Sequence, residues 1–244
     1  MGRSVTSPAR GVPGRIIFGG SFNPLHCGHM RLALECLDRL KHWVDALEFL
    51  PTSRPPHKDA GRLLPFCMRV EMIKGAIGSF RAMSCNEVES FRAGLSYTYE
   101  TLAEMADADN LYFLLGSQDF NLLPQWHRGL ELLNVANLVV VPRGDVSSND
   151  FLGQCFQFFG EVELLDPRAV EAGPGAVAVR HGCGRRVFWL PAPHLAISAS
   201  YVRDCWLCGR SVDYLVPAEV MDVLNREERA ARACWEGNSA PCSM

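Results

Sequence analysis

The 244-residue chain lacks the features that mark three common classes of protein. No apolar run approaches the roughly 20 residues that a membrane-spanning helix needs. Lys and Arg number 24 against 27 Asp and Glu, a net charge of −3, and this balance argues against a broad surface for nucleic acid or anionic membranes. Residues 1–14 contain no apolar core, so we expect a disordered tail there rather than a signal peptide. None of these absences excludes a small basic pocket for one phosphorylated ligand.

Disulfide and zinc frameworks also lack support, although the chain has ten cysteines. Without a secretion signal, these cysteines indicate reduced thiols and a cytoplasmic location. Cys205 and Cys208 form one CxxC pair in a helical pattern, and no second Cys/His pair stands at zinc-finger spacing. His181 and Cys183 lie upstream and would complete such a site only from a loop. The pattern favours thiols on a helix, and we predict no metal site.

The most informative stretch is IIFGGSFNPLHCGHM, residues 16–30. Its apolar beginning predicts a short buried strand, which Gly19 and Gly20 end. A turn follows, and His26 and His29 lie at the start of a helical pattern. Glycines let a ligand approach the backbone closely, and the N–H groups of a first helical turn favour an anion. Because histidines add donors whose charge follows pH, the stretch predicts a phosphate site.

Apolar periodicity along the chain predicts an α/β fold with a parallel sheet. Residues 16–18, 28–42 and 44–50 are expected to form strand, helix and strand, joined by the usual right-handed crossover. The other predicted strands are 82–86, 111–115, 138–142 and 186–190, and the other predicted helices are 65–79, one from 96–98 to 105, one starting at 198–200, and 218–229. Residues 143–185 are expected to hold one helix and a long loop. We expect one domain over 15–230, with tails at 1–14 and 231–244.

Polar and aromatic side chains that follow predicted strands are further candidates, each with a plainer alternative. Lys58 lies in a stiff loop, PPHK, which suits a phosphate contact and a solvated turn equally well. Asp119 follows a predicted central strand, and ligands of open α/β sheets bind at the carboxyl ends of strands. Trp126 is either a packing residue or an aromatic platform for a planar ligand.

The segment ISASYVR, residues 197–203, is a second candidate for phosphate binding. Ser198 and Ser200 lie at the expected helix start, and Arg203 follows one turn later. Small hydroxyls, N–H groups and a guanidinium together suit a phosphate. Taken alone, the segment is explained as well by an ordinary serine N-cap.

Six motifs together resemble the HxGH nucleotidyltransferase superfamily and, more closely, bacterial nicotinate-nucleotide adenylyltransferases. They are GGSFNPLHCGH at 19–29, PPHK at 55–58, SYT at 96–98, GSQDF at 116–120, LPQWHR at 123–128 and ISASYVR at 197–203. Each motif is weak alone, but their order and spacing match the family across about residues 15–226, which is a strong signal. Class I aminoacyl-tRNA synthetases share HxGH but would need a KMSKS-like loop, whose place ISASYVR takes. The resemblance implies a single, Rossmann-like domain with a doubly wound parallel sheet.

The resemblance also implies a reaction in NAD biosynthesis. ATP and nicotinate mononucleotide (NaMN) would give deamido-NAD and pyrophosphate, with Mg²⁺ bridging the phosphates of ATP. The 5′-phosphate of NaMN would attack the α-phosphorus of ATP in line, and an anionic nucleophile needs no strong general base. Catalysis would then rest on holding two anions and stabilising the charge that develops between them.

The family motifs assign roles to individual residues of this chain. His26 and His29 would bind the ATP phosphates, with His29 stabilising the transition state, and Arg203 would act with them. Further ATP contacts are assigned to Gly19, Gly20, Ser21, Gly116, Asp119, Ser198 and Ser200. NaMN would be bound by Lys58, Tyr97, Thr98 and Trp126, with Trp126 stacking on the pyridine ring.

Three positions depart from the residues that the family often has. Ser21 and Ser200 replace Thr and keep a hydroxyl, whereas Asn23 replaces Asp, loses a charge and can still hold the turn. The alternatives are the same fold acting on nicotinamide mononucleotide or 4′-phosphopantetheine, and a non-catalytic nucleotide-binding module. From the charge balance we expect no nucleic-acid or membrane partner, and the sequence leaves a homo-oligomer open.

Overall fold

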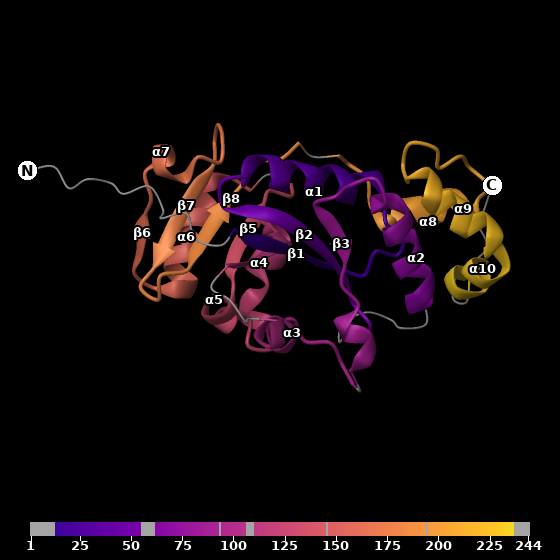
Figure 1. Ribbon diagram of the computed structural model, residues 1–244, viewed down its shortest axis with the longest axis horizontal. Coiled ribbons are helices and arrows are strands. Elements are labelled where there is room, and N and C mark those ends of the chain that lie inside the picture. The colour runs from indigo at the N-terminus through magenta and orange to yellow at the C-terminus, as the bar shows by residue number, and fades with distance from the viewer. Residues whose placement is uncertain are drawn as a thin grey trace, which may run out of the picture. The chain divides into compact units, whose positions relative to one another are not determined.

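A computed structural model of the chain describes residues 13–54, 62–92, 94–105, 110–144, 146–193 and 195–236. Eight strands form one sheet in the order β3-β2-β1-β4-β5-β8-β7-β6 (Figure 1). The strands are β1 (Gly14–Gly20), β2 (Val44–Pro51), β3 (Met83–Cys85), β4 (Leu111–Gly116), β5 (Asn137–Val141), β6 (Val162–Leu164), β7 (Val177–His181) and β8 (Arg186–Trp189). The first six in this order follow the 3-2-1-4-5-6 order of doubly wound sheets. The predicted α/β fold is therefore confirmed.

The sheet is mostly parallel, but its last two strands are not. β1 pairs in parallel with β4, β4 with β5, and β5 with β8, whereas β7 is antiparallel to both β8 and β6. The expectation of one helix and a long loop over 143–185 is therefore wrong. The helix is α6 (Ser148–Phe159), and β6, α7 (Pro167–Val170) and β7 occupy the remainder. β6 has three residues and its Leu164 is 57% exposed, so no alternation of burial marked it as a strand.

The chain divides into two compact units, and β1 and β2 each run from the first into the second. The first unit comprises Met1–Phe18, Leu34–Leu47 and Thr98–His194, and the second comprises Gly19–Ala33, Glu48–Tyr97 and Leu195–Met244. In the first, α4 (Ser117–Asn121) and α5 (Leu132–Val135) pack on strands β4 and β5. In the second, α2 (Phe66–Ile77) packs on α9 (Ala218–Arg226), and α10 (Glu228–Glu236) packs on α8 (Ala199–Leu207). Each unit therefore has its own apolar core.

Helix α2 buries the apolar stripe that the sequence predicted, and it also buries an arginine that the sequence did not single out. Arg69 is 1% exposed. Its Nη1 donates to the carbonyl oxygens of Ser21 and Thr52, both at 2.9 Å, and its Nε donates to that of Leu64 at 3.0 Å. Burial lowers the pKa of Arg69 to about 10, so the side chain stays charged at neutral pH. A buried cation therefore holds the turn that follows β1.

The end of the chain is more ordered than expected. We expected a helix over 218–229 and a tail from 231, but α9 is followed by α10, which continues to Glu236. Ala231 and Trp235 lie four residues apart on this helix, and both are fully buried. A nine-residue helix anchored by a single large side chain carries too little periodicity to be recognised in a charged sequence. Residues 1–12 and 237–244 lie outside the described part of the chain.

No helix within the described ranges has the length and apolar character needed to cross a bilayer. The remaining helices are α1 (Cys27–Arg39) and α3 (Thr98–Met105), and both begin where the sequence analysis placed them to within a residue. The Cys205–Cys208 pair lies in and just after α8, and none of the nine cysteines in the described part of the chain forms a disulfide there.

Candidate active site

Side chains that lie over glycines shape the turn between β1 and α1. Phe22 adopts φ 44°, a region that bulky residues rarely occupy, and its ring packs on Phe49 with centroids 5.4 Å apart. A Cβ added at Gly20 would lie 3.0 Å from the Phe22 ring, and one added at Gly28 would lie 3.0 Å from His26 Nδ1. A larger residue at either position would press on one of these rings, and this explains part of the GGSFNPLHCGH pattern.

The two histidines of this motif stack on each other. Their ring centroids are 3.6 Å apart and their planes differ by 23°, with His26 buried and His29 partly exposed. The backbone N–H of His26 donates to Nδ1 of His29 at 3.2 Å. Because an accepting ring nitrogen carries no hydrogen, the neutral His29 ring carries its hydrogen on Nε2. His29 is thus set up as an Nε2–H donor, which is the role a phosphate oxygen requires.

Arg203 joins the two predicted phosphate-binding segments within the second unit. Its Nη1 donates to the carbonyl oxygen of Asn23 at 2.7 Å, across 180 residues of sequence. Its Nη2 donates to Ser200 Oγ at 3.2 Å. Ile197, at the approach to α8, has its carbonyl oxygen 3.7 Å from where a Cβ on Gly28 would lie. The ISASYVR segment and the GGSFNPLHCGH turn are therefore neighbours, as the phosphate-site interpretation requires.

The helix-cap alternative for Ser198 also holds. Its Oγ accepts the backbone N–H of Tyr201 at 3.1 Å and caps α8. Burial lowers the pKa of Arg203, and the nearby charge of Arg62 lowers it further. Arginine nevertheless stays protonated near neutral pH, so two positive side chains lie close together here and favour an anion.

Metal ligands do not gather in the described part of the chain. Nowhere within it do three or more His, Cys, Asp or Glu side chains come together to hold an ion. The phosphate-site donors described above are imidazole, hydroxyl and guanidinium groups. A magnesium ion fits this donor set only as part of a metal–nucleotide complex, with its ligands supplied by phosphate oxygens and water.

Within the first unit, the GSQDF motif lies at the carboxyl end of β4. Ser117 Oγ accepts the N–H of Arg143 at 2.8 Å, which ties the start of α4 to the segment after β5. A Cβ on Gly116 would lie 3.1 Å from Arg143 Cδ and 3.7 Å from Asp119 Oδ2. Asp119 itself is exposed. The strand end therefore carries a carboxylate beside a backbone that only glycine fits without displacing a neighbour.

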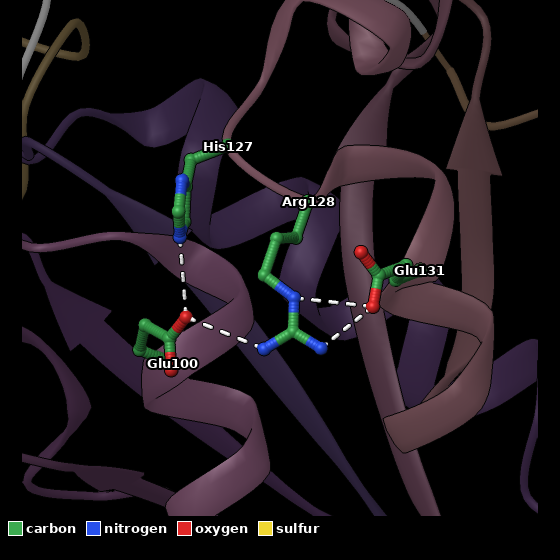
Figure 2. Close-up of polar contacts among 4 residues, drawn as sticks. All are labelled: Glu100, His127, Arg128 and Glu131. Atoms are coloured by element: carbon green, nitrogen blue, oxygen red, sulfur yellow. Dashed lines mark hydrogen bonds and ion pairs between the residues drawn. The ribbon is translucent and has the colours of Figure 1, made fainter.

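The loop that carries Trp126 is held against the first turn of α3. His127 Nε2 lies 3.2 Å from Glu100 Oε1, and Arg128 Nη1 lies 3.6 Å from the same oxygen. Arg128 also contacts Glu131 at 2.6 Å, so that it bridges the two carboxylates (Figure 2). The Arg128 guanidinium stacks over the Tyr99 ring at 3.6 Å. These contacts link the half-buried Trp126 to the segment that begins with Thr98.

Gly129 makes the tight turn of this loop possible. A Cβ at this position would lie 2.0 Å from the carbonyl oxygen of Leu123 and 2.8 Å from Cβ of Trp126. Arg128, just before it, adopts φ 53°. Close packing of the Gly129 backbone against Leu123 and Trp126 therefore sets the position of Trp126. The ion pairs of Arg128 stabilise the same loop.

The predicted site residues fall into three groups. His26, His29, Ser200 and Arg203 come together with the turn in the second unit, and Gly116, Asp119, Thr98 and Trp126 belong to the first unit. Tyr97 is the last residue of the middle segment of the second unit, and Lys58 lies outside the described residues. The individual binding roles remain predictions.

Sequence reasoning did not identify three residues that hold these elements in place, namely Arg69, Arg128 and, in its full role, Asn23. Asn23 was expected to hold the turn, but its contacts with distant segments were not foreseen. Arg69 lies among the apolar residues on the buried face of α2. A charged residue at such a position is unusual, and this is the signal in the sequence that could have identified it. For Arg128 the only such signal is the following glycine.

Comparison with known proteins gives a consistent result. Residues 17–205 match the Cytidylyltransferase-like family. A probable nicotinate-nucleotide adenylyltransferase of Pelobacter propionicus is 33% identical over 222 residues, which are 89% of this chain and 98% of that protein. One of Pseudomonas paraeruginosa is 35% identical over 212 residues, 85% of this chain and 92% of that protein. The fold resembles Plasmodium falciparum nicotinic acid mononucleotide adenylyltransferase complexed with NaAD, at a TM-score of 0.62 and 18% identity over 89% of this chain and 97% of that one.

Replacing Gly129 with alanine should destabilise the protein by about 2 kcal/mol or more, because the new Cβ would clash with backbone and not with a flexible side chain. Urea unfolding followed by circular dichroism measures the change. Gly153→Ala is the matched control, because Gly153 lies inside α6 with nothing within 4 Å of its added Cβ. There alanine should stabilise by about 0.5–1 kcal/mol. Equal effects of the two substitutions would contradict the steric role of Gly129.

Proposed function

Because the chain belongs to the Cytidylyltransferase-like family and, within it, to the nicotinate-nucleotide adenylyltransferases, we propose that it transfers the adenylyl group of ATP to NaMN. The products are deamido-NAD and pyrophosphate, in a step of NAD biosynthesis. The chain is accordingly an enzyme of the nucleotidyltransferase class. The contact that most directly supports this function is that of Arg203 with Asn23, since it unites two segments suited to phosphate.

In this reaction, an oxygen of the NaMN phosphate forms a new bond to the α-phosphorus of ATP. The bond from that phosphorus to the bridging α–β oxygen breaks, and pyrophosphate leaves with the electron pair. Negative charge grows on the α-phosphate oxygens and on the leaving group. A donor fixed in advance stabilises this charge more than water does, because it need not reorient during the reaction.

His29 is suited to be that donor. The backbone N–H that occupies its Nδ1 keeps hydrogen on Nε2, and stacking on His26 fixes the plane of the ring. We assign His29 to the α-phosphate and His26 to the same group of phosphates. Gly19, Gly20 and Ser21 bring the backbone of the turn close to these anions.

The charged and hydroxyl side chains near α8 are assigned to the leaving group. Arg203 neutralises the β- and γ-phosphates, and Ser198 and Ser200 contribute hydroxyls at the same helix start. The proximity of Arg62 and Arg203 supports this assignment, since two cations held close together are stabilised by an anion between or beside them. We assign Gly116 and Asp119 to the adenosine, and Lys58 to the phosphate of NaMN.

The nicotinate ring is assigned to the Trp126 loop. Trp126 stacks on the pyridine, and Tyr97 and Thr98 contact its carboxylate side. The ion pairs of Glu100 with His127 and Arg128 support this assignment, because they tie the loop to the residues that follow Thr98. Removing these ion pairs is expected to weaken the binding of NaMN.

Mg²⁺ enters this proposal as part of the ATP substrate. Carried by ATP, the ion would supply positive charge that reduces the repulsion between the two reacting anions. The donors of His29, Ser200 and Arg203 would act beside it on the phosphate oxygens. We place the reaction in the cytoplasm, where reducing conditions keep thiols such as those in the described part of this chain out of disulfides.

Pyrophosphate release by purified protein tests the function directly. With ATP and Mg²⁺, turnover should require NaMN and should give deamido-NAD, identified by mass. Nicotinamide mononucleotide and 4′-phosphopantetheine serve as the matched acceptors. Faster turnover with either of them would replace the proposed acceptor, and no turnover with any would refute an adenylyltransferase function.

His29→Ala should lower kcat by about 100- to 1,000-fold, the usual cost of removing one preorganised donor to a transition-state anion. Steady-state kinetics with saturating ATP and NaMN measures the loss, and circular dichroism checks the fold. His42→Ala is the control, because the His42 side chain is 51% exposed and lies in the first unit. Near-normal turnover of His29→Ala would exclude the assigned role.

Trp126→Ala should raise KM for NaMN by about fivefold or more and change KM for ATP far less, because stacking on one ring contributes about 1–3 kcal/mol. Trp126→Phe keeps an aromatic face and should recover most of the affinity. The two Michaelis constants are measured separately, each with the other substrate saturating. A parallel rise in both constants would contradict selective stacking.

A further inference from the structure

Helix α10 brings one large side chain into the interior of the second unit. Trp235 is fully buried. Its indole meets the ring of Trp206 edge-on, with centroids 5.4 Å apart and planes at 89°. Arg232, on the same helix, stacks over Trp206 at 4.9 Å. The helix lies beyond residues 17–205, the part of the chain that matches the family model.

Trp235 reaches the phosphate-binding turn through Asn23. Its Nε1 donates to Asn23 Oδ1 at 3.3 Å, across 212 residues of sequence. The same oxygen accepts the backbone N–H of Leu64 at 3.0 Å, and Asn23 Nδ2 donates to the carbonyl oxygen of Arg62 at 2.7 Å. The last of these bonds needs an amide donor, so an aspartate carboxylate could not form it. Asn23 is 7% exposed, and both Oδ1 and Nδ2 of its side chain form hydrogen bonds.

The backbone of the same residue holds the candidate catalytic arginine. Arg203 Nη1 donates to the Asn23 carbonyl oxygen at 2.7 Å. A rotation or shift of Asn23 therefore moves the acceptor on which the Arg203 guanidinium rests. Trp235 also acts on the neighbouring cation, because its own carbonyl oxygen accepts Arg62 Nη2 at 3.1 Å. Trp235, Asn23 and Arg62 thus form a closed circuit of hydrogen bonds.

We propose that Trp235 is a positioning residue for ATP, which fixes Asn23 and through it the direction of Arg203. This inference rests on the proposed function only for its identification of ATP as the ligand. If Trp235 had only a structural role, replacing it would lower stability and would not affect one substrate more than the other. If it positions Arg203, replacing it should weaken the binding of ATP and change the binding of NaMN little.

The test compares Trp235→Phe with Trp206→Phe. Both substitutions remove an indole N–H and keep an aromatic ring in the same cluster, but the contact with Asn23 is made by Trp235. ATP affinity is measured by calorimetric titration without acceptor, KM is measured for each substrate, and the melting temperature is recorded. Trp235→Phe should weaken ATP binding about fivefold, with KM for NaMN unchanged within twofold. Trp206→Phe should lower the melting temperature and leave ATP binding within twofold.

A double-mutant cycle with Asn23→Ala tests the route of the effect. Once the Asn23 side chain is removed, adding Trp235→Phe should weaken ATP binding no further. Full additivity of the two substitutions, or ATP binding by Trp235→Phe within twofold of the wild type, would overturn the proposal. The titration needs no acceptor, so a wild-type protein that binds ATP and fails to adenylylate NaMN would refute the proposed function alone.

Discussion

The turn after β1 depends on hydrogen bonds that its carbonyl groups accept from distant parts of the chain. Gly20 accepts the N–H of Thr52 at 2.9 Å, Ser21 accepts Arg69 Nη1 at 2.9 Å, and Asn23 accepts Arg203 Nη1 at 2.7 Å. A turn has no ladder of its own, so its buried backbone groups must find such partners. The carbonyl groups of the turn accept these bonds, and none of the three bonds uses a backbone N–H group of the turn. His26 and His29 follow directly after this fixed turn.

The described side chains of the candidate phosphate site are hydrogen-bond donors, and no pair of catalytic carboxylates lies among them. Adenylyl transfer to a phosphate starts from an anionic nucleophile, so the protein's task is to place two anions and to stabilise charge. Arg69 holds the turn from inside, with a pKa lowered by burial to about 10 but still charged. Arg203, which is partly exposed, holds it from α8. One type of side chain thus serves as scaffold in one place and is proposed as a ligand-binding group in the other.

The parts predicted from sequence are those that local pattern encodes. The strands β1, β2, β4, β5 and β8 were predicted because buried parallel strands are continuously apolar, and the turn after β1 was singled out because glycines and histidines share one short stretch. Contacts between residues far apart in the sequence have no local pattern that would predict them. Arg69 reaches Ser21 across 48 residues, and Trp235 reaches Asn23 across 212. The antiparallel strands β6 and β7 were missed because strands of three and five residues carry little periodicity, and α10 was missed because one tryptophan anchors it.

The two units hold their functional residues by different physical means, and this difference bears on how specificity can change. The phosphate turn is held by buried hydrogen bonds, whose loss leaves unsatisfied groups and is costly. The Trp126 loop is held by steric contact at Gly129 and by the exposed contacts of Arg128 with Glu100, Glu131 and Tyr99. Exposed ion pairs contribute little individually, so substitutions among them disturb the loop without disturbing the turn. With the acceptor assigned to the Trp126 loop, as proposed, we expect acceptor preference to vary in this fold more easily than the geometry of the turn.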